Sequence, residues 1–160
     1  MIFLDLENTV IESWDCLVPM QDNINAIEKY ISNDDSIIGV FSFAIWDSHD
    51  VSVFMRDVYP LLPILTDRLG IVMHMDDLKK KLSEEFHVTV VDEDFVTFLR
   101  KEYAFEIYVK FLVEAGLSEN EFVLIDDVVP DRTVIMKVRG KDITVRTVNV
   151  KTIIAEVKND

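Results

Sequence analysis

Ile2-Phe3-Leu4-Asp5-Leu6-Glu7-Asn8-Thr9-Val10 is the stretch that decides the fold. Three apolar residues lead into the carboxylate of Asp5, and a second carboxylate follows at Glu7. Apolar runs of this kind are typical of buried strands in a parallel sheet, and such strands end at the sheet edge where α/β proteins bind ligands. We therefore expect the side chain of Asp5 to face that edge, with Glu7 on the loop just beyond it.

A second stretch, Phe122-Val123-Leu124-Ile125-Asp126-Asp127, has the same form. If the two strands lie side by side, four carboxylates gather at one edge of the sheet. Carboxylates repel one another unless a cation joins them, and sets of oxygen ligands suit Mg²⁺. The sequence therefore predicts a magnesium site at this edge.

Four short motifs, taken in order, resemble those of the haloacid dehalogenase-like superfamily. Asp5-Leu6-Glu7-Asn8-Thr9 is similar to the family's Asp-x-Asp motif, with the second acid lengthened by one methylene. Ile37-Ile38-Gly39-Val40-Phe41-Ser42 ends in a hydroxyl, as the second motif does. Lys101 lies at about the usual distance before the last core strand, and Asp126-Asp127 with Asp131 resembles the fourth motif.

The resemblance implies an α/β fold of the Rossmann-like, three-layer type, with a central parallel sheet and a minimal cap. The strand Ile2–Leu6 should lie between the strands Ile37–Ser42 and Phe122–Ile125, flanked by helices. Residues 1–160 are expected to form a single domain.

The resemblance also implies a magnesium-dependent phosphatase that acts on a small phosphorylated molecule. Asp5 would form an aspartyl-phosphate, and Glu7 would protonate the leaving oxygen and later activate water. Ser42 and Lys101 would hold the phosphoryl oxygens. The implied metal ligands are Asp5, Glu7 through its backbone carbonyl, Asp126, Asp127 and, in reserve, Asp131.

Glu7 and the end of the chain depart from the family pattern. One added methylene moves the carboxyl group by about 1.5 Å, and a misplacement of about 1 Å can cost on the order of a hundredfold in rate. A second interpretation is therefore a catalytically impaired relative that binds and modulates a protein partner through its acidic surface or its C-terminal hairpin. That hairpin is predicted at residues 133–148, around Arg139-Gly140-Lys141-Asp142.

The net charge of −14 arises from 16 basic and 30 acidic residues. Such a charge repels a phosphate backbone, so nonspecific binding of nucleic acid is not expected. A small phosphorylated substrate is compatible with it, because Mg²⁺ and one Lys reverse the sign locally. The same surface would suit a basic protein partner.

The composition, with 49% hydrophobic and 29% charged residues, is typical of a globular protein. No apolar run approaches the roughly 20 residues that span a membrane, and the first strand follows Met1 without room for a signal peptide. We therefore expect a cytoplasmic protein. Cys16 has no internal disulfide partner, and His49, His74 and His87 lack the spacing of a zinc site.

Periodicity and cap residues predict the remaining elements. Helices are expected at residues 22–31 with Asp22 as N-cap, after Asp47 or Ser48, at 61–69, at 76–86, and at 94–116 with a break near Tyr103. Short strands are expected at residues 71–74 and 87–91. Residues 11–20 should form a loop or hairpin over the site, where Trp14 either lines a flap or packs on the core.

Overall fold

The computed structural model describes the backbone of residues 1–89 and 92–160, and the side chains of these residues except Glu93, Asp94 and Thr97. Its strands are β1 (Ile2–Leu4), β2 (Ile38–Val40), β3 (Leu69–Val72), β4 (Glu121–Asp126), β5 (Arg132–Val138) and β6 (Lys141–Asn149). Its α-helices are α1 (Gln21–Tyr30), α2 (Ser48–Val53), α3 (Met75–Phe86), α4 (Glu93–Leu99), α5 (Lys101–Glu114) and α6 (Val150–Asn159).

These strands form one mostly parallel sheet with the order β3-β2-β1-β4-β6-β5. Its neighbours are parallel except for the antiparallel pair of β5 and β6. β1 lies between β2 and β4, as the sequence predicts, and Leu4 is in register with both Val40 and Ile125. The amide of Asp5 donates to the Ile125 carbonyl at 3.0 Å, so the pairing with β4 extends beyond the end of β1.

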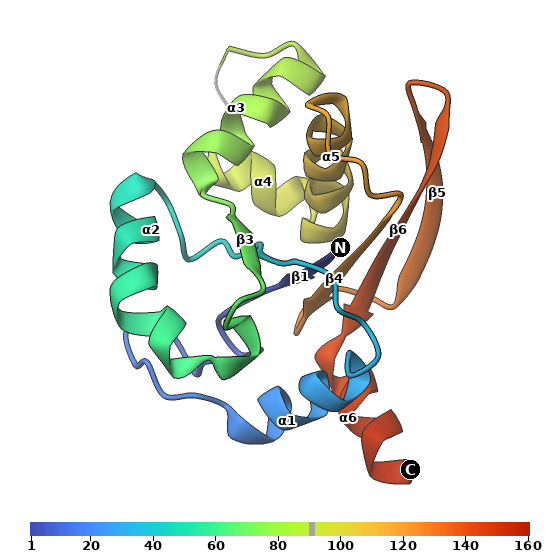
Figure 1. Ribbon diagram of the computed structural model, residues 1–160. Helices are drawn as coiled ribbons and strands as arrows, with labels where there is room; N and C mark the ends of the chain where they lie inside the picture. Colours follow the sequence, from blue (N-terminus) through green and yellow to red (C-terminus); the bar gives the residue numbers. More distant parts are fainter. Residues whose placement is uncertain (90–91) are drawn as a thin grey trace.

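Helices cover both faces of the sheet and give the predicted three layers. In Figure 1, α3, α4 and α5 lie on one side of the sheet, and α1 and α6 lie on the other. Strand residues alternate between two hydrophobic cores: Ile2 and Leu4 pack with α1 and α6, whereas Phe3 packs with α3 and α5. The ring of Phe3 lies over Gly39 of the neighbouring strand, where an added Cβ would come within 2.4 Å of it. Gly39 is therefore needed for close packing of an aromatic ring on the sheet.

Several predicted elements are confirmed with small shifts. The side chain of Asp47 caps α2 by accepting a hydrogen bond from the Asp50 amide at 2.9 Å. Asp22 is not the N-cap of α1, because that helix begins one residue earlier, at Gln21. The predicted break in the long helix falls at Arg100, three residues before Tyr103, where the backbone adopts a φ of 72°.

Two predicted elements are wrong. Residues 61–69 do not form a helix. Short 3₁₀ turns occupy Tyr59–Leu61 and Pro63–Leu65, because Pro60 and Pro63 each lack the amide donor that an α-helix needs. Gly70 does not end a helix but lies inside β3. The strand predicted at residues 87–91 is absent over residues 87–89, where His87 ends α3 in a left-handed conformation with a φ of 53°. Val90 and Val91 lie outside the described residues.

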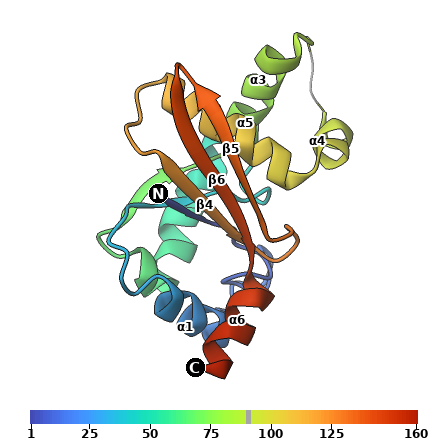
Figure 2. The same ribbon diagram turned by 90° about the vertical axis from the view of Figure 1, so that its right-hand side faces the viewer.

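The chain ends in the predicted hairpin and in a helix that the sequence analysis did not anticipate. β5 and β6 pair from Arg132↔Thr147 to Val138↔Lys141, and β6 lies parallel to β4. Figure 2 shows this hairpin at the outer edge of the sheet, with α6 below it. α6 packs on α1 and contributes the buried Ile153 to the core. Among the described helices, none has the length and apolar character needed to cross a membrane.

Candidate functional site

The candidate site lies where the strand order reverses. From β1 the chain moves outward through β2 and β3, and β4 then lies on the opposite side of β1. In open α/β sheets, ligands bind in the crevice outside the carboxyl ends of the strands at such a point. Asp5 follows β1 directly, Asp126 is the last residue of β4, and Asp127 comes next. Both central strands therefore deliver carboxylates to this crevice.

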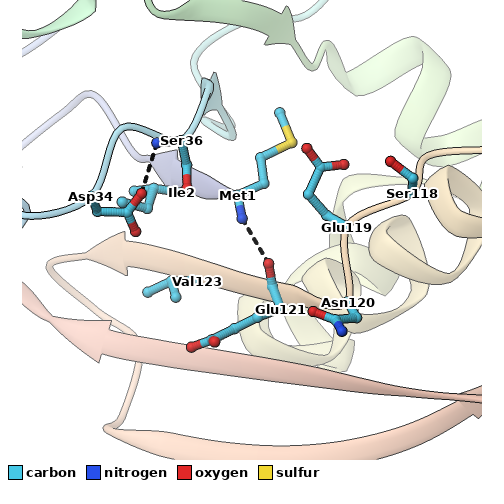
Figure 3. Close-up of a pocket in the computed structure, with 9 residues that line it drawn as sticks. All are labelled: Met1, Ile2, Asp34, Ser36, Ser118, Glu119, Asn120, Glu121 and Val123. Atoms are coloured by element: carbon cyan, nitrogen blue, oxygen red, sulfur yellow. Dashed lines mark hydrogen bonds between the residues drawn. The ribbon is translucent and has the colours of Figure 1, made fainter.

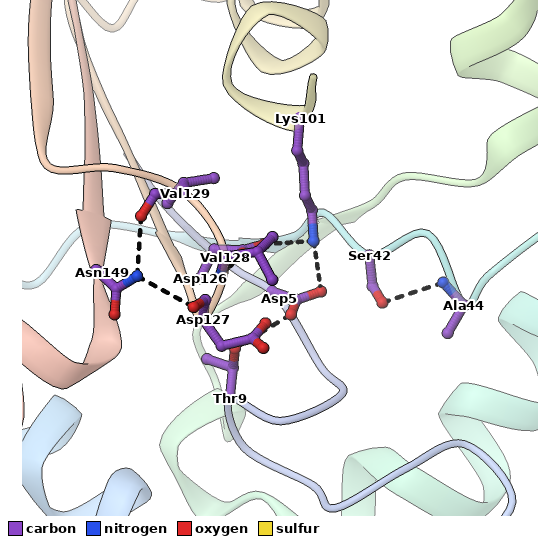
Figure 4. A network of polar contacts seen from close by, with 10 residues as sticks. All are labelled: Asp5, Thr9, Ser42, Ala44, Lys101, Asp126, Asp127, Val128, Val129 and Asn149. Atoms are coloured by element: carbon purple, nitrogen blue, oxygen red, sulfur yellow. Dashed lines mark hydrogen bonds and ion pairs between the residues drawn. The ribbon is translucent and has the colours of Figure 1, made fainter. Parts of the chain in front are cut away.

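Three of the predicted carboxylates come together. Oxygen atoms of Asp5, Asp126 and Asp127 all lie within 4.8 Å of one another. The Asp5 and Asp126 side chains are 5% and 0% exposed. Lys101, at the start of α5, places its Nζ atom 2.8 Å from Oδ1 of Asp5 and forms a second ion pair with Asp126 (Figure 4). The predicted lysine thus reaches the predicted acids.

Burial and mutual repulsion shift the protonation equilibria of this cluster. Burial raises the pKa of Asp5 to about 7; the charges of Asp126 and Asp127 act in the same direction, and Lys101 opposes them. Burial and the charge of Asp126 also raise the pKa of Asp127. Burial disfavours the Lys101 ammonium, but its ion pairs with Asp5 and Asp126 outweigh that effect, so the pKa of Lys101 is raised. Lys101 is therefore a permanent positive charge among the three acids.

Hydrogen bonds hold the acids in place. The Thr9 hydroxyl donates to Oδ2 of Asp5 at 3.1 Å, and the Val128 amide donates to Oδ1 of Asp126 at 2.7 Å. The Asn149 side-chain amide donates to the backbone carbonyl of Asp127 at 3.0 Å and fixes the loop after β4. Sequence reasoning gave no role to Thr9, although it belongs to the first motif, or to Asn149. A signal for Asn149 existed, because it is the polar last residue of β6, a predicted strand that ends at the same edge as β4.

A cleft of about 330 Å³ opens on this cluster. Its polar lining comprises Asp5, Glu7, Asn8, Ser42, Lys101 and Asp127. Its apolar lining comprises Phe43, Ala44, Val96 and Val128. The Lys101 Nζ atom also lies 5.1 Å from the centre of the Phe43 ring, a cation–π distance that the sequence analysis did not foresee.

Glu7 and Ser42 line the cleft but are not part of the three-carboxylate group. Oε2 of Glu7 accepts a hydrogen bond from the Trp14 amide at 2.8 Å, which holds the longer carboxyl group against the loop after β1. Of the two positions predicted for Trp14, the structure shows the one on the core. Its side chain packs against the core and is absent from the described lining of the cleft. The Ser42 hydroxyl is buried and accepts a hydrogen bond from the Ala44 amide at 3.3 Å.

Asp131 lies apart from these residues. One of its carboxylate oxygens accepts a hydrogen bond from the Asn149 amide at 2.8 Å, and the other accepts one from the Thr152 hydroxyl at 2.7 Å. Both oxygens are thus occupied at the start of α6. The fourth motif therefore contributes its acidic pair to the site, while Asp131 joins the hairpin to the final helix.

The acidic cluster fits a hard divalent cation. Its donors are carboxylate oxygens, and their separation of up to 4.8 Å is close to the roughly 4 Å that opposite ligands span around Mg²⁺. Oδ2 of Asp126 is fully buried; it faces Lys101 as an ion pair but does not accept a hydrogen bond of good geometry from any described group. Three carboxylates thus face the single cation of Lys101, and the residues could hold a metal ion.

A second hollow, of about 350 Å³, lies at the opposite, amino-terminal end of the parallel strands. Asp34, Glu119 and Glu121 line it together with the amino group of Met1 (Figure 3). Although its volume is similar, its acids do not form a metal-binding group in the described part of the chain. We therefore place the candidate site at the carboxyl edge.

The fold and this site define an α/β protein with a six-stranded, mostly parallel central sheet and a buried cluster of three aspartates that could hold a metal ion. Such an arrangement is consistent with a Rossmann-like fold. No protein-family model, no curated protein and no solved structure matches the chain.

Proposed function

We propose that the protein is a magnesium-dependent phosphohydrolase that transfers the phosphoryl group of a small phosphorylated compound first to Asp5 and then to water. The observation that supports this function is the convergence of Asp5 and Asp127, which line the cleft, with Lys101 and with the fully buried Asp126 behind them. Phosphoryl transfer to a carboxylate requires a nucleophile, an acid–base group and positive charge at one point, and this cleft contains candidates for each.

In this proposal, a carboxylate oxygen of Asp5 forms a bond to phosphorus as the bond to the ester oxygen breaks. Glu7, which lines the same cleft, gives a proton to the leaving oxygen and afterwards takes a proton from the water that cleaves the aspartyl-phosphate. Lys101 and the hydroxyl of Ser42 bind the phosphoryl oxygens. The Thr9 hydroxyl keeps Asp5 oriented through its hydrogen bond to Oδ2.

Asp5, Asp126 and Asp127 would hold the Mg²⁺ ion, with the backbone carbonyl of Glu7 as a further ligand. When bound, Mg²⁺ would neutralise the carboxylates and draw charge from the phosphoryl oxygens. Lys101 is the positive charge that the chain itself supplies, and it pairs with both Asp5 and Asp126.

Hydrolysis of 4-nitrophenyl phosphate, with and without Mg²⁺, tests this function. We expect turnover that depends on Mg²⁺ and is lost in Asp5→Asn, because an amide is not a nucleophile toward phosphorus. Asp34→Asn, at the opposite end of the sheet, is the matched control and should retain the wild-type rate. An absence of Asp5-dependent turnover across a panel of small phosphate esters would refute the proposal.

A second candidate function, recognition of a protein partner, is favoured by the distribution of charge. Residues 132–160 contain seven Lys and Arg against three Asp and Glu, whereas residues 1–131 contain nine against 27. The C-terminal hairpin and α6 are thus a basic portion of an acidic protein. We propose that an acidic segment of a partner docks on this hairpin, whereas a basic partner would dock on the remaining surface.

Binding of a fluorescent oligoglutamate peptide, followed by anisotropy at low and high salt, tests the second candidate. Binding should weaken as salt screens the charges and should be lost in the double variant Lys137→Glu, Lys141→Glu. Lys79→Glu on α3 removes the same kind of charge elsewhere and should leave binding unchanged. Equal binding by all three proteins would contradict docking on the hairpin.

A further inference from the structure

The walls of the cleft differ in chemistry from its floor. Asp5, Asp127 and Lys101 form the charged floor, with the fully buried Asp126 behind them, and we call the apolar lining residues Phe43, Val96 and Val128 the wall. Phe43 comes from the loop after β2, Val96 from α4 and Val128 from the loop after β4, so three separate segments contribute apolar groups to one polar site. Val96 is only 2% exposed, so most of the free apolar surface belongs to Phe43 and Val128. A ligand whose phosphoryl group reaches the floor must place the rest of its atoms against this wall.

Positive charge in the cleft is limited to one group. Among the described residues that line it, Lys101 is the only cation, and its ammonium already pairs with Asp5 and Asp126. The residues whose side chains lie outside the description are Val90, Val91, Glu93, Asp94 and Thr97, and none of them is basic. A second anionic group on a ligand would therefore meet carboxylates such as Glu7 and Asp127 without a cation of its own.

Val128 stands between this cleft and a neighbouring hollow that contains Arg100. Both hollows are lined by Lys101 and Val128, and the Val128 side chain is 68% exposed. A ligand bound in the cleft would cover part of this apolar surface, and its burial would favour binding. Arg100 lines the neighbouring hollow and does not line this cleft.

We infer that the cleft selects compact phosphate monoesters whose leaving group is apolar and carries no second negative charge. The leaving group packs against Phe43, Val96 and Val128, while the single phosphoryl group occupies the floor. Compactness follows from the cleft volume of about 330 Å³, at the lower end of the range for small-molecule sites. This inference deepens the proposed phosphohydrolase function and rests on it, because the bound ester has a leaving group only if the protein hydrolyses it. The preference in binding can nevertheless be tested without turnover.

Calorimetric binding of three phosphonates in the presence of Mg²⁺ provides that test. Phenylphosphonate carries an apolar group, methylphosphonate carries almost none, and 3-phosphonopropionate carries a second negative charge. We expect phenylphosphonate to bind the wild-type protein at least about tenfold more tightly than either of the others, as burial of part of one aromatic ring predicts. Tightest binding of 3-phosphonopropionate, or equal binding of all three, would overturn the inference.

Two variants locate the preference. Val128→Ser should reduce the preference for phenylphosphonate over methylphosphonate by roughly threefold or more, because it removes apolar surface from the wall. Ile135→Ser, on β5 and 69% exposed in the wild-type protein, is the matched control and should leave the preference unchanged. An unchanged preference in Val128→Ser, or binding of 3-phosphonopropionate that depends on Arg100 in an Arg100→Gln variant, would show that the ligand lies elsewhere. If the preference is present but Asp5-dependent hydrolysis is absent, the binding inference stands and the phosphohydrolase function fails.

Discussion

The two ends of the parallel strands each contain an acidic hollow, and the hollows have nearly equal volumes of about 330 and 350 Å³. At the carboxyl end, the acids are buried and converge on one point with Lys101 between them (Figure 4). At the amino end, Asp34 and Glu121 are exposed and point in different directions (Figure 3). Asp34 accepts a hydrogen bond from the Ser36 amide at 2.7 Å, and Glu121 faces Arg146 at 3.6 Å.

The comparison teaches that acidity alone does not make a site in a protein with a net charge of −14. Burial raises the pKa of Asp5 to about 7, whereas hydrogen bonding to Ser36 lowers the pKa of Asp34. The first acid sits where its charge is unfavourable without a cation, and the second sits where its charge is already satisfied. Convergence and burial therefore distinguish the carboxyl-end cluster as the place where a cation is needed.

Removing the cation from each end should have very different effects. Lys101→Met leaves Asp5 and Asp126 buried without a counter-charge and should lower the free energy of unfolding by about 3–5 kcal/mol. Arg146→Met removes the cation that faces Glu121 at the exposed amino end and should cost less than about 1 kcal/mol. Urea denaturation at pH 7 measures both values, and similar losses in the two variants would contradict the distinction between the ends.

Shortening an acid should change turnover only at the carboxyl end. Glu7→Asp restores the shorter spacing of the family motif, and a gain of about 1 Å in placement should raise kcat tenfold to a hundredfold. The effect should fall on kcat because the acid–base group acts mainly in the transition state. Glu119→Asp, in the amino-end hollow, should leave kcat unchanged. A large drop in Glu7→Asp would instead mean that the hydrogen bond from the Trp14 amide holds the longer side chain in its working position.

The pH dependence of stability should have opposite signs at the two ends. The pKa of Asp5 is raised on folding, so its contribution is fully present below its unfolded pKa and is lost as the pH rises toward about 7. In metal-free buffer, the free energy of unfolding should therefore fall between pH 5 and 7 by up to about 1.4 kcal/mol per pH unit for one proton. Urea denaturation of Asp5→Asn should show a shallower slope than the wild-type protein.

Asp34 supplies the control for this pH dependence. Its pKa is lowered on folding, so its contribution is present above the ordinary pKa of the group and is lost as the pH falls. Because Asp34 is exposed, the effect should be small, and Asp34→Asn should leave the slope between pH 5 and 7 unchanged. A flattened slope in Asp34→Asn would place the titrating acid at the wrong end of the sheet.

The backbone is strained directly before Lys101. Arg100, directly before Lys101, has a φ of 72° and a ψ of 150°, a combination that glycine adopts far more easily than arginine. Arg100→Gly should therefore raise the free energy of unfolding by about 1 kcal/mol, whereas Arg100→Ala should not, because alanine keeps the strain. Thermal or urea denaturation measures both. A loss of stability in Arg100→Gly would show that the side chain matters more than the backbone geometry.

The sequence predicted the centre of the fold because buried parallel strands have a strong signature. The apolar runs before Asp5 and Asp126 predicted the two strands, and the resemblance of the ordered motifs implied that β1 lies between its neighbours. The observed pairing of β1 with β4 brings the acids together. Lys101 could be assigned only through the order of the motifs, because nothing local shows that its side chain reaches back to β1. The hairpin at residues 133–148 followed from turn chemistry at Arg139-Gly140.

Other features depended on contacts that no local pattern encodes. Asp131 had the spacing of a metal ligand, but the amide of Asn149 and the hydroxyl of Thr152 take its two oxygens. Trp14 lay on a loop near the site, yet its side chain reaches the core and only its backbone amide meets Glu7. Residues 61–69 showed helical periodicity, but Pro63 limited them to short 3₁₀ turns. In each case tertiary contacts or a missing amide overrode the pattern.

Titration of the protein with Mg²⁺ in a calorimeter tests the central claim, that the carboxyl-end cluster is a cation site, most directly. Asp127→Asn removes one of the three charges at the carboxyl end, and the double variant Asp34→Asn, Glu121→Gln removes two at the amino end. We predict that one Mg²⁺ binds the wild-type protein, that Asp127→Asn weakens the affinity at least about tenfold, and that the double variant binds as the wild type does. Unchanged binding by Asp127→Asn, or loss of binding in the double variant, would contradict the account.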